Sequence, residues 1–331
     1  MESIVATIDV VTCGEPMGLF ASEVPGDLKH ADRFMRVPAG AELNVATGLS
    51  RLGLTVGFLT RLGNDHLGHW LRDVMANERL DSRFIIEDAQ HPTGLMFKSR
   101  RNDGCDPEIE YHRTGSAASH LGVDDYPSDY CHSAAHLHIT GISPALSPSV
   151  RRLIFHMAKD MRQAGKTVSF DPNLRLRLWP SLEEMKSCLN ELASFSDWIF
   201  PGLSEARLLT GLEKVDDIVD FYLAKGCSIV VIKLGAEGAY FGSANERGLR
   251  IGYPVSNIVD TVGAGDGFAA GVISALIEGL PLDQAVDRGN LIGARVLGFP
   301  GDSDGLPTRT QLSQFSIRAQ QSQRAKQEPL K

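Results

Sequence analysis

The sequence predicts an α/β fold: a three-layer α/β/α sandwich with a mostly parallel central sheet, plus a small β-strand lid. Two observations support this prediction. Short, continuous apolar runs alternate with helix-length periodic segments, which is typical of parallel strands covered by helices on both faces. Two other segments carry only short alternating runs. The runs expected to form the central strands are 4–11, 56–60, 135–139, 167–170, 198–200 and 229–233.

Helices are expected between these strands, where apolar residues recur three or four positions apart. Right-handed crossovers between parallel strands then place helices on both faces of the sheet. We expect one domain over residues 1–315, followed by a polar C-terminal tail over 316–331 that frays. The expected helices lie near 42–52, 65–79, 148–164, 181–193, 203–225, 265–278 and 282–297.

The two segments without long helical patterns are 12–37 and 91–115. The second holds the alternating runs 95–98 and 109–111, which predict short strands. Both segments are expected to project from the sandwich as extra strands. An inserted β element of this kind could cover a site or form a dimer surface. We therefore expect a lid, and a homo-oligomer that assembles through it.

The composition narrows the class of protein. The chain has 331 residues, 43% of them hydrophobic, which is enough for one large α/β domain. Its net charge of −8 argues against a nucleic-acid or anionic-membrane surface, where a basic stripe is expected. No apolar run reaches the roughly 18 residues of a membrane span. Five scattered cysteines without a CxxC pair indicate reduced thiols, and we expect a cytoplasmic protein without a signal peptide.

The segment most indicative of function is 260–271, Asp-Thr-Val-Gly-Ala-Gly-Asp-Gly-Phe-Ala-Ala-Gly. Its glycine-rich turn leads into a helix, whose first N–H groups lie at the positive end of the helix dipole. Turn and helix together form an anion site suited to a transferring phosphoryl group. Asp266 lies inside this turn, where it could either accept the proton of an attacking hydroxyl or cap the helix. The segment is neither a P-loop nor a GxGxxG motif.

This segment resembles the C-terminal signature of the pfkB-type carbohydrate kinases. A second stretch, residues 39–68, resembles the N-terminal signature of that family. The resemblance covers nearly the whole chain and implies a ribokinase-like kinase domain that uses ATP and Mg²⁺ to phosphorylate a sugar hydroxyl. It implies that Asp266 is the catalytic base and that Gly263, Ala264 and Gly265 form the anion hole. The sequence does not decide whether a monovalent cation binds at the loop before Asp266.

The nucleotide site is expected beside the turn that follows the strand 229–233. Taken alone, the two glycines Gly235 and Gly238 could simply make a tight hairpin. The resemblance implies instead that ATP phosphates lie against this turn and against Gly263 and Gly265. It also implies ATP contacts from Lys233 and, on the adenine side, from Asn290, which could otherwise be an ordinary exposed helical residue.

A metal-binding role is implied for Glu205. Members of the family often carry an Asn-x-x-Glu motif that governs Mg²⁺ and phosphate, and here Gly202 replaces the asparagine. The resemblance therefore implies contact between Glu205 and the metal through water, since Mg²⁺ usually keeps several waters. The alternative is an acid favoured by the helix dipole in the first turn of a helix.

The acceptor side of the reaction is indicated by two arginines. Arg175 follows the strand 167–170 closely and so lies at the carboxyl end of a strand, where α/β sheets bind ligands. Arg113 lies in the second lid segment. If both reach one ligand, their guanidinium groups suit a carboxylate, and the substrate is a sugar acid. The alternative is two surface arginines with no shared ligand.

Within the family, the pattern resembles the 2-keto-3-deoxygluconate kinases, through the runs 14–17, 92–95, 111–119, 169–175 and 301–308. The resemblance implies phosphorylation of 2-keto-3-deoxygluconate at its C6 hydroxyl, giving 2-keto-3-deoxy-6-phosphogluconate. The alternatives are a fructokinase-like kinase of a neutral sugar and a non-catalytic sugar-acid or nucleotide sensor. The residues implied to line the sugar pocket are Gly40, Asn44, Tyr111, Arg113 and Arg175.

A histidine cluster is the remaining candidate for a metal site. His136 and His138 are spaced to share one face of a strand, and His132 lies nearby. No further motif supplies a clear third ligand. We therefore interpret these residues as core or strand-end histidines.

Overall fold

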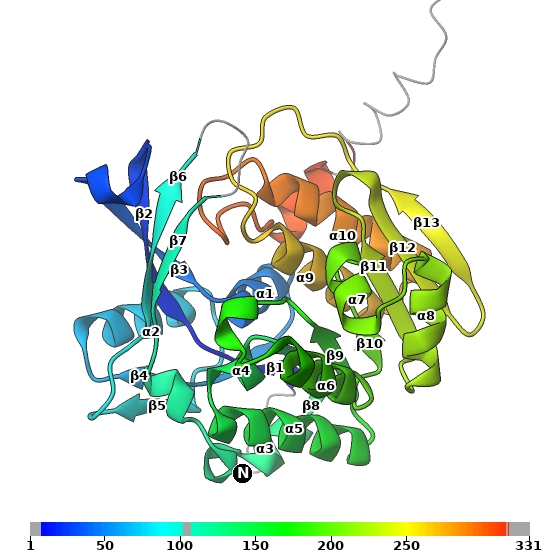
Figure 1. Cartoon of the computed structure of the whole chain (residues 1–331), viewed down its shortest axis with the longest axis horizontal. Helices are drawn as coiled ribbons and strands as arrows, with labels where there is room; N and C mark the ends of the chain where they lie inside the picture. Colours follow the sequence, from blue (N-terminus) through cyan, green and yellow to red (C-terminus); the bar gives the residue numbers. More distant parts are fainter. Residues whose placement is uncertain (1–7, 102–106, 316, 318–331) are drawn as a thin grey trace, which may run out of the picture.

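The structure is a computed structural model of the chain, and it describes residues 8–101, 107–315 and 317. Within these residues, the central sheet has nine strands and helices cover both faces (Figure 1). In spatial order the strands are β13 (Arg247–Ile251), β12 (Gly238–Ser243), β11 (Ile229–Lys233), β10 (Trp198–Ile199), β9 (Thr167–Asp171), β8 (Ala134–Thr140), β1 (Ile8–Cys13), β4 (Val56–Gly63) and β5 (Ile85–Asp88). From β11 to β5 all neighbours are parallel, and β12 and β13 extend one edge in antiparallel fashion. The predicted three-layer, mostly parallel sandwich is confirmed.

All six predicted central strands are present, with shifted ends. Residues 4–7 of the first predicted strand lie outside the described residues, and β1 begins at Ile8. The strands β5, β12 and β13 were not among the predicted strands. Residues of β13 alternate between exposed and half-buried, and Ile251 is 73% exposed, because this strand forms an edge of the sheet.

The helices divide between the two faces of the sheet. Helices α5 to α8 pack in one hydrophobic cluster, and α1, α2, α9 and α10 pack in a second cluster on the other face. The bounds are α1 (Ala41–Arg51), α2 (His66–Asn77), α3 (Ser128–His132), α4 (Ser143–Leu146), α5 (Pro148–Gln163), α6 (Leu182–Ala193), α7 (Leu203–Thr210), α8 (Val215–Ala224), α9 (Ala264–Ile277) and α10 (Leu282–Val296). None of the helices in the described part of the chain combines the length and apolar composition that crossing a bilayer requires.

The single helix predicted over 203–225 is wrong, because the structure divides it into α7 and α8. Gly211 ends α7 in the left-handed conformation, with φ of 74°, which glycine adopts without steric cost. The polar tail predicted over 316–331 lies, apart from Ile317, outside the described residues.

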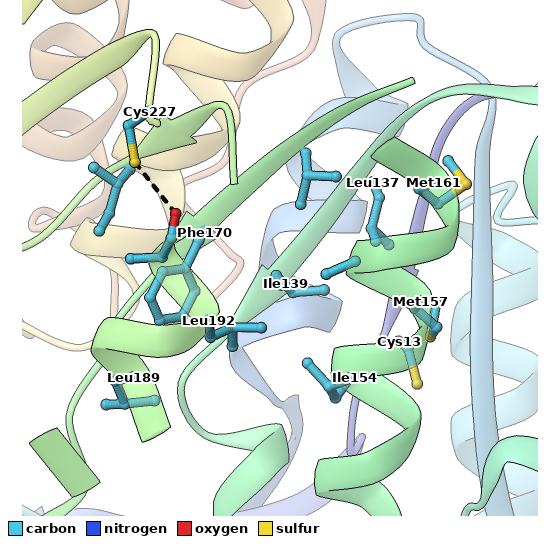
Figure 2. Close-up of a cluster of buried hydrophobic side chains, with 14 of the residues drawn as sticks. Cys13, Leu137, Ile139, Ile154, Met157, Met161, Phe170, Leu189, Leu192 and Cys227 are labelled. Carbon is cyan, nitrogen blue, oxygen red and sulfur yellow. Dashed lines mark hydrogen bonds between the residues drawn. The ribbon is translucent and has the colours of Figure 1, made fainter. Parts of the chain in front are cut away.

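Part of the first hydrophobic cluster is drawn in Figure 2. Side chains from β8 lie beside those of α5, and Phe170 of β9 lies beside those of α6. At the rim of the cluster, the Cys227 thiol donates to the carbonyl oxygen of Ala193 over 3.4 Å. This packing fixes β8 and β9, whose carboxyl ends lead into the site. The residues in contact are Leu137, Ile139, Ile154, Met157, Met161, Leu189 and Leu192.

A separate four-stranded sheet forms the predicted lid. Its order is β3 (Phe34–Ala39), β2 (Met17–Pro25), β6 (Leu95–Arg100) and β7 (Ile109–His112). In Figure 1 these strands stand together at the upper left, and β2 contacts α2. Gly40 joins the lid to α1 with φ of 137°, and a side chain there would meet the carbonyl oxygen of Glu15. Glycine is therefore required at this junction.

Candidate active site

A cavity of about 1010 Å³ lies where the lid meets the carboxyl edge of the central sheet. Its walls come from separate parts of the chain. The lid contributes Tyr111 and Arg113, the loop after β9 contributes Asn173 and Arg175, and the start of α9 contributes Asp266. Parallel strands all end at the same edge, so residues distant in sequence meet there. The cavity therefore contains the predicted base together with both predicted substrate arginines.

Asp266 is 8% exposed and lies in the first turn of α9. Its two carboxylate oxygens accept hydrogen bonds from two asparagine side chains. The Nδ2 of Asn44 donates to Oδ2 over 2.8 Å, and the Nδ2 of Asn173 donates to Oδ1 over 3.3 Å. The helix is capped at Gly263, which has no side chain, so the alternative of Asp266 as an N-cap is wrong. The carboxylate is instead held over the cavity.

The environment of Asp266 makes its carboxyl a base suited to neutral pH. Burial raises its pKa to about 7. The hydrogen bond from Asn44 opposes this shift, as does the positive charge of Arg175, while the carboxylates of Asp171 and Asp302 add to it. A general base works best when its pKa lies close to the operating pH. The site therefore holds a carboxylate that can accept the proton of a hydroxyl group.

The predicted anion hole lies at the start of α9. Gly263 has φ of 83°, and any side chain on it would collide with the carbonyl oxygen of Asp302. The N–H of Gly267 donates to the carbonyl oxygen of Gly263 over 2.8 Å, so the N–H groups of Ala264 and Gly265 precede the first helical hydrogen bond. Gly263 and Gly265 line the cavity, whereas Ala264 packs against a hydrophobic cluster. This geometry suits an anionic group beside Asp266.

Lys233 lies at the carboxyl end of β11 and lines the same cavity. Its Nζ donates to Oδ2 of Asp171 over 2.7 Å. Burial alone would favour the neutral amine, but the carboxylates of Asp171 and Glu205 raise the pKa of Lys233 above its ordinary value. The cavity therefore contains a lysine cation close to the start of α9.

Glu205 lines the cavity, but both of its oxygens already hold backbone amides. Oε1 accepts from the N–H of Leu174 and Oε2 from the N–H of Gly202, each over 2.7 Å. It thus caps α7 and anchors the loop that carries Asn173 and Arg175. Among the described residues there is no group of three histidine, cysteine or acidic side chains that could hold a metal ion. The predicted contact of Glu205 with a metal through water stays a prediction.

All five residues predicted for the sugar pocket line the cavity. Arg113 is 7% exposed, and its Nε donates to Oε2 of Glu15 over 2.7 Å. Arg175 donates from Nη1 to the carbonyl oxygen of Leu174 over 3.0 Å. The two arginines therefore share one cavity, although Glu15 already occupies one edge of the Arg113 guanidinium.

The remaining residues predicted for ATP do not line this cavity. Gly235 and Gly238 lie in the turn from β11 to β12, and Asn290 lies on α10 beside the end of β13. Gly238 has φ of 105°, and a side chain there would meet the backbone of Gly252 at 2.5 Å. The tight-hairpin explanation therefore accounts for Gly238. Asn290 is buried, and its Nδ2 donates to the carbonyl oxygen of Arg250 over 2.9 Å. Gly235 has φ of 63° and begins the short helical turn Gly235–Glu237.

His136 and His138 are core residues, as predicted. Both are fully buried and bond to the hydroxyl of Ser169, and His136 stacks on Trp198. Burial lowers the pKa of both imidazoles, so they are neutral. His132 lies at the end of α3, 2.6 Å from Asp160.

Sequence reasoning gave no role to four residues that the structure places at the site. Glu15, Asn173 and Asp302 lie within sequence runs noted for their resemblance, but nothing in those runs shows that their side chains meet Arg113, Asp266 or the lid. Lys98 occupies a position in a short alternating strand, a pattern that does not distinguish a buried lysine from an exposed one.

The chain belongs to the pfkB family of carbohydrate kinases, whose family model matches residues 7–309. It is therefore a sugar kinase. Over 309 residues it is 49% identical to the 2-dehydro-3-deoxygluconokinase of Bacillus subtilis, covering 93% of this chain and 95% of that protein. The crystal structure of a PfkB protein from Polaromonas sp. JS666 is 47% identical, with a TM-score of 0.86, over 92% of this chain and 99% of that one. An Escherichia coli protein of ribokinase II type, solved with ATP and Mg²⁺, is 25% identical, with a TM-score of 0.87, over 94% and 99%.

Proposed function

We propose that this kinase transfers the γ-phosphoryl group of ATP to the C6 hydroxyl of 2-keto-3-deoxygluconate, also called 2-dehydro-3-deoxygluconate. The observation that carries the proposal is that Arg113 and Arg175 line the same cavity as Asp266 and the start of α9. One sugar acid could then bind the arginines through its carboxylate and place a hydroxyl group beside Asp266. The name of the Bacillus subtilis relative agrees with this substrate.

In this reaction Asp266 accepts the proton of the C6 hydroxyl as that oxygen attacks the γ-phosphorus. Asn44 and Asn173 hold the two carboxylate oxygens, so that the base points into the cavity before the substrate arrives. The amides at Gly263, Ala264 and Gly265 stabilise the negative charge of the transferring group. The bond between the γ-phosphorus and ADP breaks, and the products are 2-keto-3-deoxy-6-phosphogluconate and ADP.

The carboxylate end of the sugar acid is held by Arg175 and Arg113, with Gly40 and Tyr111 beside it. Glu15 orients Arg113 by pairing with its Nε and Nη2, and the proposed carboxylate would bind the remaining Nη1. Tyr111 lies under this guanidinium, with 5.6 Å between Arg113 Cζ and the ring centroid. Such a fixed arginine loses little entropy when it binds a carboxylate.

ATP is proposed to place its phosphates near Lys233, Gly263 and Gly265, with Gly235, Gly238 and Asn290 toward the nucleoside. The cationic Lys233 favours phosphate at this edge of the sheet. Mg²⁺ bound to ATP would neutralise phosphate charge, and Glu205 could reach it only through water, because its oxygens hold two backbone amides. The ATP and Mg²⁺ in the Escherichia coli relative agree with this proposal.

The test is ATP consumption with Mg²⁺ on 2-keto-3-deoxygluconate, fructose and ribose side by side. A kcat/KM for the sugar acid at least about 100-fold above that for either neutral sugar is the expected result, because a site built around a charged group rejects ligands that lack it. Turnover that is equal or better with fructose would replace the substrate proposal with the neutral-sugar alternative. ATP or ADP binding without turnover of any acceptor would favour the sensor alternative.

We also propose that the enzyme forms a homo-oligomer through its lid. The lid carries partly exposed apolar side chains, Val24 at 45% and Met35 at 40%, on strands β2 and β3. Light scattering on the purified protein is the test, with Met35→Lys as the variant expected to weaken assembly. A monomeric wild type would contradict this proposal.

A further inference from the structure

Lys98 is a lysine of the lid that is buried against the body of the protein. It is 2% exposed, and its Nζ donates to Oδ2 of Asp260 over 2.7 Å and to Oδ1 of Asp302 over 2.8 Å. Burial alone would favour the neutral amine, but the carboxylates of Asp302 and Asp260 raise the pKa of Lys98. A lysine is rarely buried unless its ammonium group is paired with acidic side chains. Lys98 therefore depends on Asp260 and Asp302 for its buried position.

Both aspartates touch the turn that builds the anion hole. Oδ1 of Asp260 accepts a hydrogen bond from the N–H of Val262 over 3.0 Å and so shapes the approach to α9. The backbone of Asp302 packs directly on Gly263, where no side chain would fit. The ammonium group of Lys98 therefore joins the two segments on either side of the anion hole.

The same lid strands carry the sugar-side residues. Lys98 lies on β6, which pairs with β7, and Met96 of β6 is opposite Tyr111. Arg113 directly follows β7. The ion pairs of Lys98 thus connect the strands that contact the sugar with the turn that holds the phosphoryl group.

We propose that Lys98 is a positioning residue that serves as a fixed internal cation, holding the anion-hole turn in its working shape and coupling it to the lid. This inference rests on the proposed phosphoryl transfer at Asp266. It also answers the open question of a monovalent cation near this loop, because the lysine ammonium already lies between the carboxylates. The wild-type enzyme therefore needs no monovalent cation there.

Removal of the ammonium group would leave two buried carboxylates facing a space that a small cation can fill. A second cavity of about 560 Å³ is lined by Lys98, Asp260 and Thr261, among others, and gives ions a route to this space. A potassium or ammonium ion should therefore replace the lost charge in Lys98→Ala. It should not do so in Lys98→Met, because the methionine side chain fills most of the space.

The experiment measures kcat and KM for wild type, Lys98→Ala, Lys98→Met and Lys98→Arg in chloride salts of tetramethylammonium, potassium and ammonium at equal ionic strength. Wild type should have the same kcat in all three salts. In tetramethylammonium chloride, Lys98→Ala should lose roughly 10–100-fold in kcat with a smaller change in KM, since small misplacements of reacting groups cost this much. Potassium or ammonium should restore most of that loss, whereas Lys98→Met should stay impaired in every salt and Lys98→Arg should stay independent of the salt. The matched control is Lys29→Ala, a lid lysine whose side chain is 71% exposed, which should behave as wild type.

A second readout needs no acceptor sugar. The Tm of Lys98→Ala should rise with potassium but not with tetramethylammonium, and the Tm of wild type should respond equally to both. The inference is overturned if Lys98→Ala keeps the wild-type kcat in tetramethylammonium chloride, if its loss is not recovered by either small cation, or if wild type itself requires potassium. If wild type turns over only a neutral sugar, the substrate proposal fails, and the same comparison is made with that sugar.

Discussion

Asn44 donates a hydrogen bond to Asp266 over 2.8 Å, although 222 residues separate them in sequence. The contact joins the start of α1, just after the lid, to the start of α9. Asn44 is only 3% exposed, so its amide is held in place by the packing of α1. The Asp266 carboxylate therefore has a fixed orientation, and the hydrogen bond favours its charged form.

Replacement of Asp266 by asparagine should remove proton acceptance while keeping the shape of the site. The expected loss in kcat is about 10²–10⁴-fold, the usual contribution of a positioned general base. The affinity for ATP should stay within a few-fold, because the anion hole is made by backbone amides. Steady-state kinetics together with ATP titration calorimetry would check this. A variant with the wild-type kcat would remove Asp266 from the role of base.

The same variant should be more stable than wild type at alkaline pH. The pKa of Asp266 is raised from 3.8 to about 7 in the folded protein, so between these values the folded state holds a proton that the unfolded state has lost. The free energy of unfolding contributed by this group therefore falls as pH rises from about 4 to 7. Asparagine does not titrate, so the free energy of unfolding of Asp266→Asn does not fall in this way. By pH 8 it should exceed that of wild type by up to roughly 2–4 kcal/mol.

Chemical denaturation of both proteins at pH 4.5 and pH 8 measures this difference. The advantage of the variant should be small at the lower pH and largest at the higher one. A difference in stability that does not change with pH would show that the Asp266 carboxyl titrates near its ordinary value in the folded protein.

Loss of the Asn44 amide should shift the pH dependence of the reaction. In wild type, kcat/KM should rise as Asp266 loses its proton, with a midpoint at about pH 7. In Asn44→Leu the hydrogen bond that lowers this pKa is gone, so the midpoint should move to higher pH. Profiles of kcat/KM between about pH 5.5 and 9 would show the shift. An unchanged midpoint would indicate that Asn44 does not stabilise the charged carboxylate.

The layers of the fold could be predicted from the sequence because the central strands are buried on both faces and are therefore continuously apolar. Strand β13 escaped prediction because an edge strand alternates between exposed and half-buried residues. The break between α7 and α8 was missed because apolar periodicity continues past Gly211, whose left-handed conformation depends on the backbone and not on the pattern. Apolar runs and periodicity thus predicted the three-layer sandwich, but they did not predict its edge strands or where its helices end.

At the site, the glycine-rich segment was enough to predict that Gly263, Gly265 and Asp266 lie in one cavity, because they are within a few consecutive residues. Contacts between distant segments could not be predicted in the same way. Lys98 lies 162 residues from Asp260 and 204 residues from Asp302, and no periodicity links them. The pairing of Glu15 with Arg113, which fixes the direction of that guanidinium, spans 98 residues and was equally hidden.

Arg175 offers the sharpest test of the acid substrate. It lies in the cavity on the loop that Glu205 anchors, and it is held there by backbone carbonyl oxygens. Truncation to alanine removes the charge that we propose pairs with the sugar carboxylate in both the ground state and the transition state. The KM for 2-keto-3-deoxygluconate should therefore rise about 10–100-fold with a smaller change in kcat, as for the loss of one charged hydrogen bond.

The comparison that isolates the carboxylate is the same pair of enzymes with fructose. Because fructose has no carboxylate, its weak turnover should be nearly unchanged in Arg175→Ala, and the preference for the acid should collapse. Arg152→Ala, on an exposed position of α5, serves as the control for loss of one positive charge. An equal loss with acid and neutral sugar would mean that Arg175 supports the loop or the phosphates, and the carboxylate would then have to be held by Arg113.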